Sequence, residues 1–498
     1  MPRTVRALAS LRHFAVTWGL PDDFGGMTSV VLRRSAGFAA AGAPVTVLTF
    51  DDRLDTPALV ETLRERGVLA DGVEVLHLWD WLSTNPLLPA PGVGELPFAP
   101  IRQSPADEDA SVTETAAAGV VRRRERRSSA GVLLQVDRYR ADGSLLVSDL
   151  RDVTERGRPG GRSVVVCDSH GIPVRGFTSI WGLYRHWLDR LTAKRRSVLI
   201  VDSKTAARFI RGYRRKHVAT VHVVHSSHRA GDGEPGRPLK ESRREVLERA
   251  EEFDAVVTLT QRQRHDLAAD LAPTVHLAVV PNAGSLDRLL HAPLARPADR
   301  GVILASLTPR KRVDDAVAAA ATAGVALDVY GEGPERHALQ QQILRLGSTA
   351  QLRGHRSDAS SAFRDASFSL LTSTAEGAPL VILESMAAGC IPIAYDIRYG
   401  PRDMIRDGVD GFVVPPGDIA AMAARIGELV EMPERERQRM RRAARRSATR
   451  FRQSTVTGQW AELVAEIARR RWPAPPRAGL PTRVGRRARR VLARLRPA

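Results

Sequence analysis

Short apolar runs alternate with longer amphipathic segments along the first fifty residues. The run from Arg12 to Val16 has the length of a buried strand, residues 30–40 carry apolar side chains at helical spacing, and residues 45–50 resemble a second strand. Gly25 and Gly26 form a turn between the first strand and the helix. This order predicts a β-α-β unit whose glycine turn lies at the carboxyl end of a strand, where open α/β sheets bind ligands.

The alternation of strands and helices lapses between about residues 71 and 197. Residues 104–131 change from an acidic to a basic stretch, which predicts a solvated loop. Residues 132–150 contain two short alternating runs on either side of a turn at Asp142 and Gly143, which predicts a β-hairpin. The sequence therefore predicts a β-rich insertion at about 71–197.

Strands and helices alternate again after the insertion, and Pro281 with Asn282 begins a proline-spaced linker. We expect two doubly wound, Rossmann-like α/β domains that face each other across a cleft. The N-terminal domain spans 1–285 and includes the insertion, the C-terminal domain spans 286–471, and 472–498 form a basic tail. Further strands are predicted at residues 163–167, 198–202, 218–224, 255–259, 275–280, 302–305, 327–330 and 368–371.

Composition sets limits on the location of the protein. The 498 residues have a mean hydropathy of -0.22 and contain no apolar run long enough to cross a bilayer. No signal peptide is visible at the N-terminus. Only two cysteines occur, far apart, so we expect a reducing compartment and no disulfide framework. The expected location is the cytoplasm, with peripheral attachment to the inner face of the plasma membrane.

The net charge of +19 indicates a polyanionic partner. Anionic polymers and anionic lipid both fit, and a genome that favours arginine is the alternative source of the charge. Aromatic residues make up only 5% of the chain and no basic-aromatic module is evident, so we expect no nucleic-acid partner. In the tail, arginines share the sequence with apolar residues that fit one helical face, which predicts a basic amphipathic helix on anionic lipid or a solvated tail.

The segment from Thr372 to Asp418 holds the strongest candidate chemistry. Glu376 follows an apolar strand, Gly377 allows close backbone approach, and Pro379 is tolerated at the start of a helix. The free amides at such a helix start bind sugar or phosphate oxygens. Glu384 would project from the same helix toward a second part of one ligand.

This segment resembles the paired-glutamate motif of retaining nucleotide-sugar glycosyltransferases of the GT-B fold, in the large family numbered four. The resemblance rests on Glu376 and Glu384, on the Gly-Ala-Pro-Leu run after Glu376, and on the closing GVDGFVVPPGD. The run from Tyr395 to Ile405 and the GGMT segment are most similar to enzymes that put α-linked glucose or N-acetylglucosamine on wall teichoic acid, a poly(glycerol-phosphate) or poly(ribitol-phosphate). In those enzymes a β-rich insertion serves oligomer assembly and acceptor binding, which implies a homo-oligomer here.

The resemblance also implies roles for individual residues. Glu376 would contact the donor sugar, Glu384 the ribose, and Lys311 the diphosphate of a UDP-sugar. His225, with His228 as the competing candidate, would touch the sugar. The further nucleotide-sugar contacts are implied at Gly25, Gly26, Arg310, Gly377, Ala378, Pro379 and Leu380.

One position departs from the family pattern. The family has an arginine five residues before the lysine, and this chain has Ser306 there. A serine offers one donor where a guanidinium offers several, although Arg310 and Arg312 flank Lys311. Two alternatives therefore stay open: a glycosyltransferase of the same fold that acts on another acceptor, such as a lipid-linked glycan, and an inactive polyanion-binding homologue.

No metal cofactor is expected. Asp107 and Asp109 form a D-x-D signature, which binds divalent ions in a different glycosyltransferase fold. Here the signature lies in a low-complexity stretch without a preceding strand, so we assign it no metal. The positive charge for catalysis is expected from Lys311 and helix ends instead.

Overall fold

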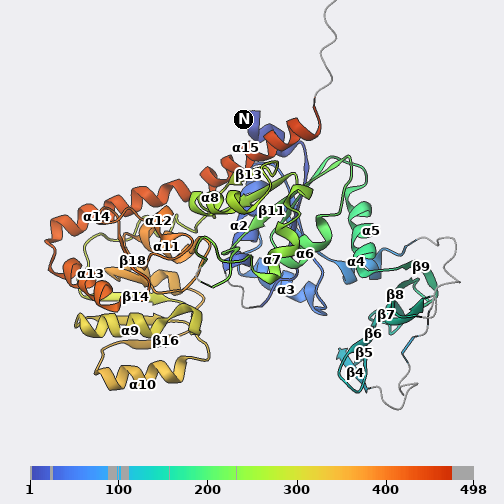
Figure 1. Cartoon of the computed structure of the whole chain (residues 1–498), viewed down its shortest axis with the longest axis horizontal. Helices are drawn as coiled ribbons and strands as arrows, with labels where there is room; N and C mark the ends of the chain where they lie inside the picture. The colour runs from blue at the N-terminus through green and yellow to red at the C-terminus, as the bar shows by residue number, and fades with distance from the viewer. Residues whose placement is uncertain are drawn as a thin grey trace, which may run out of the picture.

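The computed structural model describes residues 3–22, 26–87, 98, 100–101, 111–155, 158–231 and 233–473. Within these residues the chain forms two parallel α/β domains and a separate antiparallel sheet (Figure 1). Gly25, the D-x-D signature and residues 474–498 of the predicted tail lie outside the described residues. None of the described helices combines the length and the apolar character needed to cross a bilayer.

The first domain is built on a parallel sheet with the strand order β13-β12-β11-β10-β1-β2-β3. Its strands are almost continuously apolar and buried, as expected for a sheet covered by helices on both faces. The strands are β1 Arg12–Val16, β2 Val45–Thr49, β3 Val73–His77, β10 Ser197–Val201, β11 Val218–Val224, β12 Ala255–Thr258 and β13 Leu277–Val279. The helices are α1 Arg3–Ala9, α2 Gly26–Ala40, α3 Thr56–Glu65, α4 Leu78–Thr84, α5 Ile180–Thr192, α6 Lys204–Ile210, α7 Glu241–Leu247 and α8 Gln261–Asp270.

The second domain repeats this architecture with the strand order β16-β15-β14-β17-β18-β19. Its strands are β14 Arg300–Leu304, β15 Ala326–Tyr330, β16 Gln351–Gly354, β17 Phe368–Leu371, β18 Ile391–Tyr395 and β19 Phe412–Val414. The helices of this half of the chain are α9 Val313–Thr322, α10 Arg336–Leu346, α11 Leu380–Ala388, α12 Pro401–Met404, α13 Ile419–Glu431, α14 Glu434–Ala448 and α15 Gln453–Arg471. Two doubly wound domains are thus confirmed.

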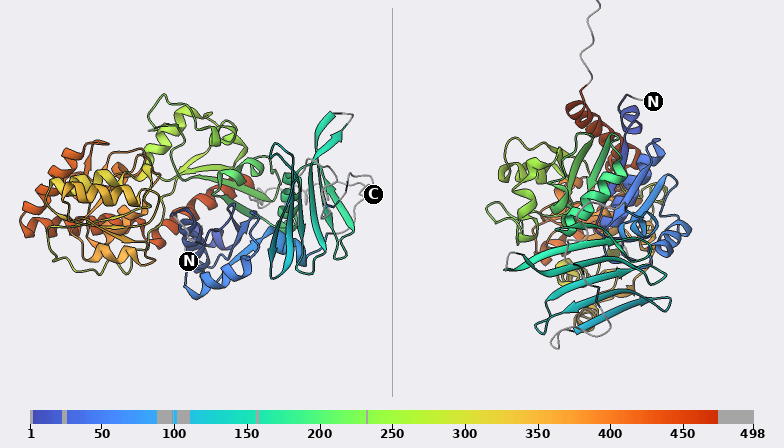
Figure 2. Two further views of the ribbon diagram at one scale, coloured as in Figure 1. Left: turned by 90° about the horizontal axis from the view of Figure 1, so that it is seen from below. Right: turned by 90° about the vertical axis from the view of Figure 1, so that its right-hand side faces the viewer.

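The insertion is an antiparallel sheet in which each strand pairs with the next along the chain (Figure 2). The predicted hairpin is confirmed, because β6 and β7 pair across the turn at Asp142 and Gly143. The strands are β4 Ser111–Ala117, β5 Val120–Arg127, β6 Leu133–Tyr139, β7 Leu145–Glu155, β8 Arg158–Cys167 and β9 Pro173–Phe177. The expectation that this sheet assembles copies of the chain stays a prediction.

The prediction of a solvated loop over residues 104–131 is wrong for its described part, which forms β4 and β5. Arginines of β5 have carboxylate partners in the same sheet: Arg124 lies 2.7 Å from Glu114 on the neighbouring strand β4, and Arg126 lies 2.6 Å from Asp152 on β7. Pairs of opposite charge across strands stabilise a sheet. The carboxylates therefore compensate the mutual repulsion of the β5 arginines.

Two predicted boundaries also change. The insertion does not begin near residue 71, because β3 pairs in parallel with β2 and belongs to the first domain. Toward the C-terminus, α15 does not belong to the second domain, although the predicted boundary at 471 placed it there. It packs on α1 and α2 and adds Trp460 to the core of the first domain, so α14 and α15 run across both domains (Figure 1).

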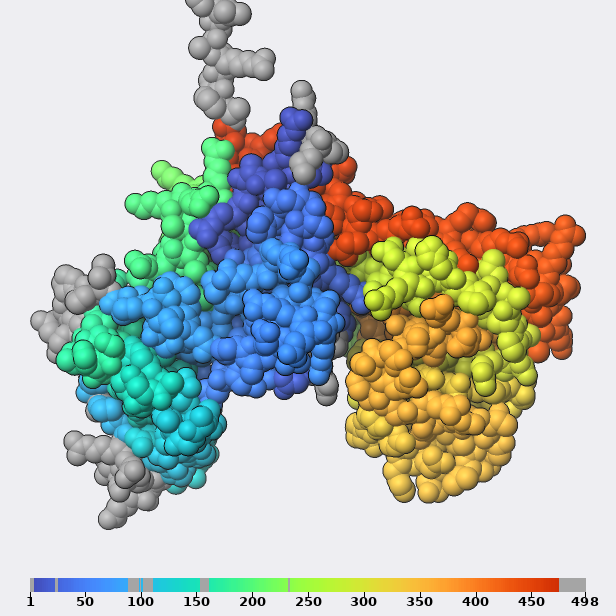
Figure 3. Space-filling model, turned by 180° about the vertical axis from the view of Figure 1, so that it is seen from behind, coloured from blue at the N-terminus to red at the C-terminus, as the bar shows by residue number. Residues whose placement is uncertain are grey.

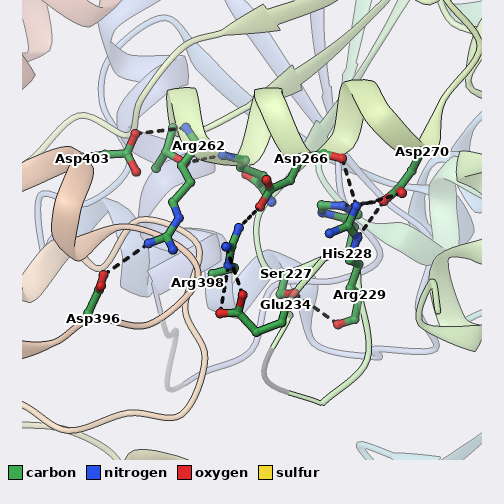
Figure 4. A network of polar contacts seen from close by, with 12 residues as sticks. Ser227, His228, Arg229, Glu234, Arg262, Asp266, Asp270, Asp396, Arg398 and Asp403 are labelled. Atoms are coloured by element: carbon green, nitrogen blue, oxygen red, sulfur yellow. Dashed lines mark hydrogen bonds and ion pairs between the residues drawn. The ribbon is translucent and has the colours of Figure 1, made fainter. Parts of the chain in front are cut away.

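Charged side chains hold the two domains together beside the cleft (Figure 4). Arg398, from the run that resembles the teichoic acid enzymes, contacts Asp266 on α8 and lies 3.0 Å from Glu234. Arg262 on α8 lies 3.2 Å from Asp396. This run therefore lies at the interface between the domains.

We expect the free energy of unfolding to be highest near pH 6.5. Burial lowers the pKa of His13 and His222 to about 4, so their stabilising contribution falls as the pH drops from 6.5. His77 behaves in the opposite way: burial opposes its charge, but hydrogen bonds with Asp51 and Asp80 raise its pKa to about 9. Its contribution is complete below pH 6.5 and is lost as the pH rises through 9.

Urea unfolding at pH 5, 6.5 and 8.5 checks this expectation. The slope on each side should be about 1.4 kcal/mol per pH unit for each proton exchanged. His77→Asn should flatten the alkaline side alone, and stability that keeps rising from pH 6.5 to 9 would contradict the assignment.

Candidate active site

A cavity of about 300 Å³ lies between the two domains. The space-filling view from behind shows the domains separated by a notch and joined by the C-terminal helices (Figure 3). The first domain lines the cavity with Gly26, Met27, Val30, His225 and Asn282, and the second domain with Arg310, Lys311 and residues 376–381. With the exception of Gly25, which is not described, and Glu384, the residues predicted to contact the nucleotide sugar meet here.

Glu376 and Lys311 form an ion pair in this cavity. Lys311 Nζ lies 2.6 Å from Glu376 Oε1, and Arg310 Nη1 lies 3.2 Å from the same oxygen. The loops that carry these residues follow the paired strands β14 and β17. Thr372 Oγ1 donates to the carbonyl of Lys311 at 2.9 Å, which ties the two loops together. The site is therefore built at the carboxyl edge of the second sheet, as predicted.

Gly377 brings the domains into direct contact. A Cβ atom at this position would lie 2.0 Å from the carbonyl oxygen of His225, so only glycine fits. α11 begins at Leu380, immediately after Pro379, and its first turn faces the cavity that Leu380 lines. Its unpaired amides supply positive potential beside Glu376.

His225 is held from behind by a buried ion pair. His225 Nε2 donates to Asp202 Oδ1 at 2.8 Å, and Asp202 also accepts two hydrogen bonds from Arg34, at 2.8 and 2.6 Å. Although burial raises the pKa of Asp202, the charge of Arg34 outweighs it and holds this pKa well below its usual range. Asp202 is fully buried, so an anion is fixed beneath the imidazole and orients it toward the cavity.

Glu384 stands apart from the cavity lining. Its carboxylate lies 3.7 Å from Arg33 on α2, and its side chain is 13% exposed. Burial raises the pKa of Glu384, and Arg33 opposes this shift. The carboxylate thus bridges to the first domain in this structure.

The second domain matches a known protein family. Residues 295–447 match the family described as glycosyl transferases group 1. This part of the chain is a group 1 glycosyl transferase domain.

Most of the chain is also similar to known glycosyltransferases. The chain is 21% identical to the poly(ribitol-phosphate) alpha-N-acetylglucosaminyltransferase of Staphylococcus aureus, over 84% of this chain and 92% of that protein. A mutant of S. aureus TarM, crystallised with fondaparinux, alpha-GlcNAc-glycerol and UDP, superposes with a TM-score of 0.68 at 18% identity, covering 91% of this chain and all of that one. The predicted GT-B fold is confirmed.

Another relative matches over a shorter length. The chain is 33% identical over 285 residues to an exopolysaccharide phosphotransferase of Streptomyces coelicolor. The match covers 55% of this chain but only 29% of the length of that relative.

The competing candidate residues lie in different surroundings. His225 lines the cavity, whereas His228 is fully buried, stacks on Tyr399 and contacts Asp270. Arg310 points to Glu376, whereas Arg312 pairs with Asp315 at 2.8 Å. Ser306 is exposed and does not line the cavity.

Sequence reasoning missed three residues of this site. Asp202 and Arg34 act through His225, and Asn282, assigned to the linker, lines the cavity. Asp202 ends the strand-like run at 198–202, at the same sheet edge as His225, and this was the available signal. Among the described residues no group of three or more His, Cys, Asp or Glu side chains is arranged to hold a metal ion.

Proposed function

We propose that the chain is a retaining glycosyltransferase that moves glucose or N-acetylglucosamine from a UDP-sugar to a polyol-phosphate polymer of the teichoic acid type. The observation that carries this proposal is the Glu376–Lys311 pair beside the start of α11, opposite His225 in the interdomain cavity. The location proposed with it is the cytoplasm, at the inner face of the membrane.

The charges in the cavity suit departure of a nucleoside diphosphate. Negative charge grows on the diphosphate as the bond to the sugar breaks, and Lys311, Arg310 and the amides of α11 supply fixed positive charge. The Glu376 carboxylate accepts hydrogen bonds from hydroxyls of the donor sugar. Glu384 takes the ribose hydroxyls in place of its present partner, Arg33.

The acceptor class rests on the relative that acts on poly(ribitol-phosphate) and on the charge of this chain. A net charge of +19 concentrates polyanions around the protein. The positive potential of the protein would not raise the local concentration of a neutral, lipid-linked glycan.

The test is UDP release by the purified chain. It is incubated with UDP-glucose or UDP-N-acetylglucosamine, with and without poly(glycerol-phosphate) or poly(ribitol-phosphate), and the product anomer is read by NMR. We expect polymer-stimulated release and an α-linked product. Release only with a neutral glycan would favour the other-acceptor alternative, and binding of polymer without any release would favour the inactive homologue.

Arg310 is expected to replace the missing family arginine at Ser306. Arg310→Ala should lower kcat/KM at least about tenfold, because a charge-assisted contact to the diphosphate is lost. Adding Ser306→Arg to that variant should restore part of the activity. If Ser306→Arg alone raises activity severalfold, the wild-type phosphate site is under-equipped, and Arg310 does not fill the role.

Turnover is expected to persist in excess EDTA. The positive charge assigned to catalysis comes from Lys311 and Arg310 and needs no divalent ion. Initial rates with and without EDTA should agree, and activity lost in EDTA and restored by manganese would contradict this expectation.

A further inference from the structure

Three cations outside the donor contacts gather on the first domain next to the cavity. Lys204 opens α6 directly after β10, and Lys240 and Arg243 lie at the start of α7 after β11. β10 and β11 are adjacent parallel strands, so all three residues follow the same carboxyl edge of the first sheet. α6 and α7 pack together on this domain (Figure 1).

These cations lack the carboxylate partners that many other arginines of the described residues have. The guanidinium of Arg243 donates to Ser226 Oγ at 2.8 Å. Neither Lys204, Lys240 nor Arg243 forms an ion pair with a carboxylate of the described residues. Arg34, equally part of the first domain, is by contrast neutralised by Asp202.

The electrostatics of Lys240 show how closely the cations gather. Burial lowers the pKa of Lys240, and the positive charges of Arg243, Arg310 and Lys204 lower it further. Arg310 belongs to the second domain and contacts Glu376, so the positive field at Lys240 comes from both domains. Burial alone lowers the pKa of Arg243. Charges that repel one another and are partly withdrawn from water stabilise an anion that enters between them.

The cluster is held next to His225 of the cavity. Ser226, which accepts from Arg243, directly follows His225 of the cavity. Gln263 Nε2 donates to the carbonyl of Ser226 at 3.0 Å, and the amide of Lys240 donates to the carbonyl of His228 at 2.9 Å. The segment that follows His225, whose carbonyl faces Gly377, is therefore tied to α8 and to the start of α7.

We propose that Lys204, Lys240 and Arg243 form a phosphate-binding site on the acceptor side, which holds the phosphodiester next to the polyol whose hydroxyl attacks the sugar. The inference rests on the proposed function. A phosphodiester lies only a few bonds from that hydroxyl, so a phosphate held beside His225 places the hydroxyl in the cavity. The diphosphate of the donor is the other phosphate that this site could take, and the experiment separates the two.

The experiment compares Lys240→Met and Arg243→Met with Arg244→Met. Arg244 lies on the same helix and carries the same charge, but it is exposed and pairs with Glu241 at 2.7 Å, so it is a matched control. The readouts are KM for poly(glycerol-phosphate), KM for the UDP-sugar, and UDP release in the absence of acceptor. We expect the polymer KM to rise at least about tenfold in both test variants, with the other two readouts and the control unchanged.

Three results would overturn the inference. A rise in the KM for UDP-sugar with an unchanged polymer KM would assign the cluster to the donor diphosphate. An equal rise of the polymer KM in Arg244→Met would show that the effect comes from general surface charge and not from a specific site. A clear fall in melting temperature for Arg243→Met would show a structural role, because removal of a half-buried cation without a counterion should leave stability unchanged or raise it.

Fluorescence anisotropy with labelled poly(glycerol-phosphate) measures polymer binding without sugar transfer. It therefore tests the phosphate site separately from the proposed function. If the wild-type chain binds the polymer but transfers no sugar, the proposed function fails, and a tenfold loss of binding in Arg243→Met still supports the phosphate site. If the wild-type chain transfers sugar and both test variants keep its polymer affinity, the phosphate site fails and the proposed function stands.

Discussion

Glu376→Gln is expected to lower kcat by about a hundred- to thousandfold while leaving the fold and the affinity for UDP nearly unchanged. The substitution keeps the shape of the side chain but removes the negative charge that we propose faces the donor sugar and that pairs with Lys311 at 2.6 Å. An amide accepts fewer hydrogen bonds than a carboxylate and leaves Lys311 without its counterion. Steady-state rates and calorimetric UDP binding measure the two effects separately.

Glu428→Gln is the matched control for this variant. Glu428 is an exposed partner of Arg425 on α13, so the same change in charge should leave turnover intact. Near-wild-type turnover of Glu376→Gln would show that Glu376 does not face the reacting sugar. A loss of UDP affinity equal to the loss of kcat would place Glu376 at the nucleotide instead.

Asp202→Asn is expected to destabilise the protein by about 3–5 kcal/mol, because it leaves the charge of Arg34 buried without a partner. Arg34 and Asp202 are 6% and 0% exposed, so water cannot compensate for the lost carboxylate. The variant should also impair turnover, since His225 loses the anion that orients its ring. Urea unfolding measures the first effect and kcat/KM the second.

The double variant Arg34→Met with Asp202→Asn separates these two roles. Removal of the whole ion pair should recover most of the stability, because no uncompensated charge remains in the interior. Turnover should stay low, since His225 still lacks the anion that orients its ring. Recovery of both stability and turnover would mean that Asp202 supports the fold alone.

Local patterns of the sequence predicted much of this fold. The apolar runs of the two parallel sheets, such as Val218 to Val224, are buried on both faces and stay recognisable wherever they pack. The turn at Asp142 and Gly143 joins the two strands of the hairpin, because the backbone conformation of such a turn depends on the two residues in it. Glu376 and Gly377 were predicted for the same reason, since the strand, the turn and the helix that position them are contiguous in the chain.

The wrong predictions concern elements whose charge partners or packing partners lie in other segments of the sequence. The arginine run of β5 reads as a solvated loop until Glu114 and Asp152 are placed beside it, and no local pattern reveals those partners. α15 lies at the end of the donor half of the sequence, but its apolar face, with Val456, Trp460 and Val464, finds its core in the first domain. Sequence order does not determine which core an amphipathic helix joins.

The sequence by itself determined the two-domain α/β fold and the strand, turn and helix that carry Glu376, because each depends on the order of neighbouring residues. Only the tertiary structure placed His225 at the cavity with Asp202 beneath its imidazole, and left Arg243 without a carboxylate. These choices depend on distances between residues of separate segments. Such distances follow from how the strands order themselves in a sheet and how two domains meet, which no local pattern contains.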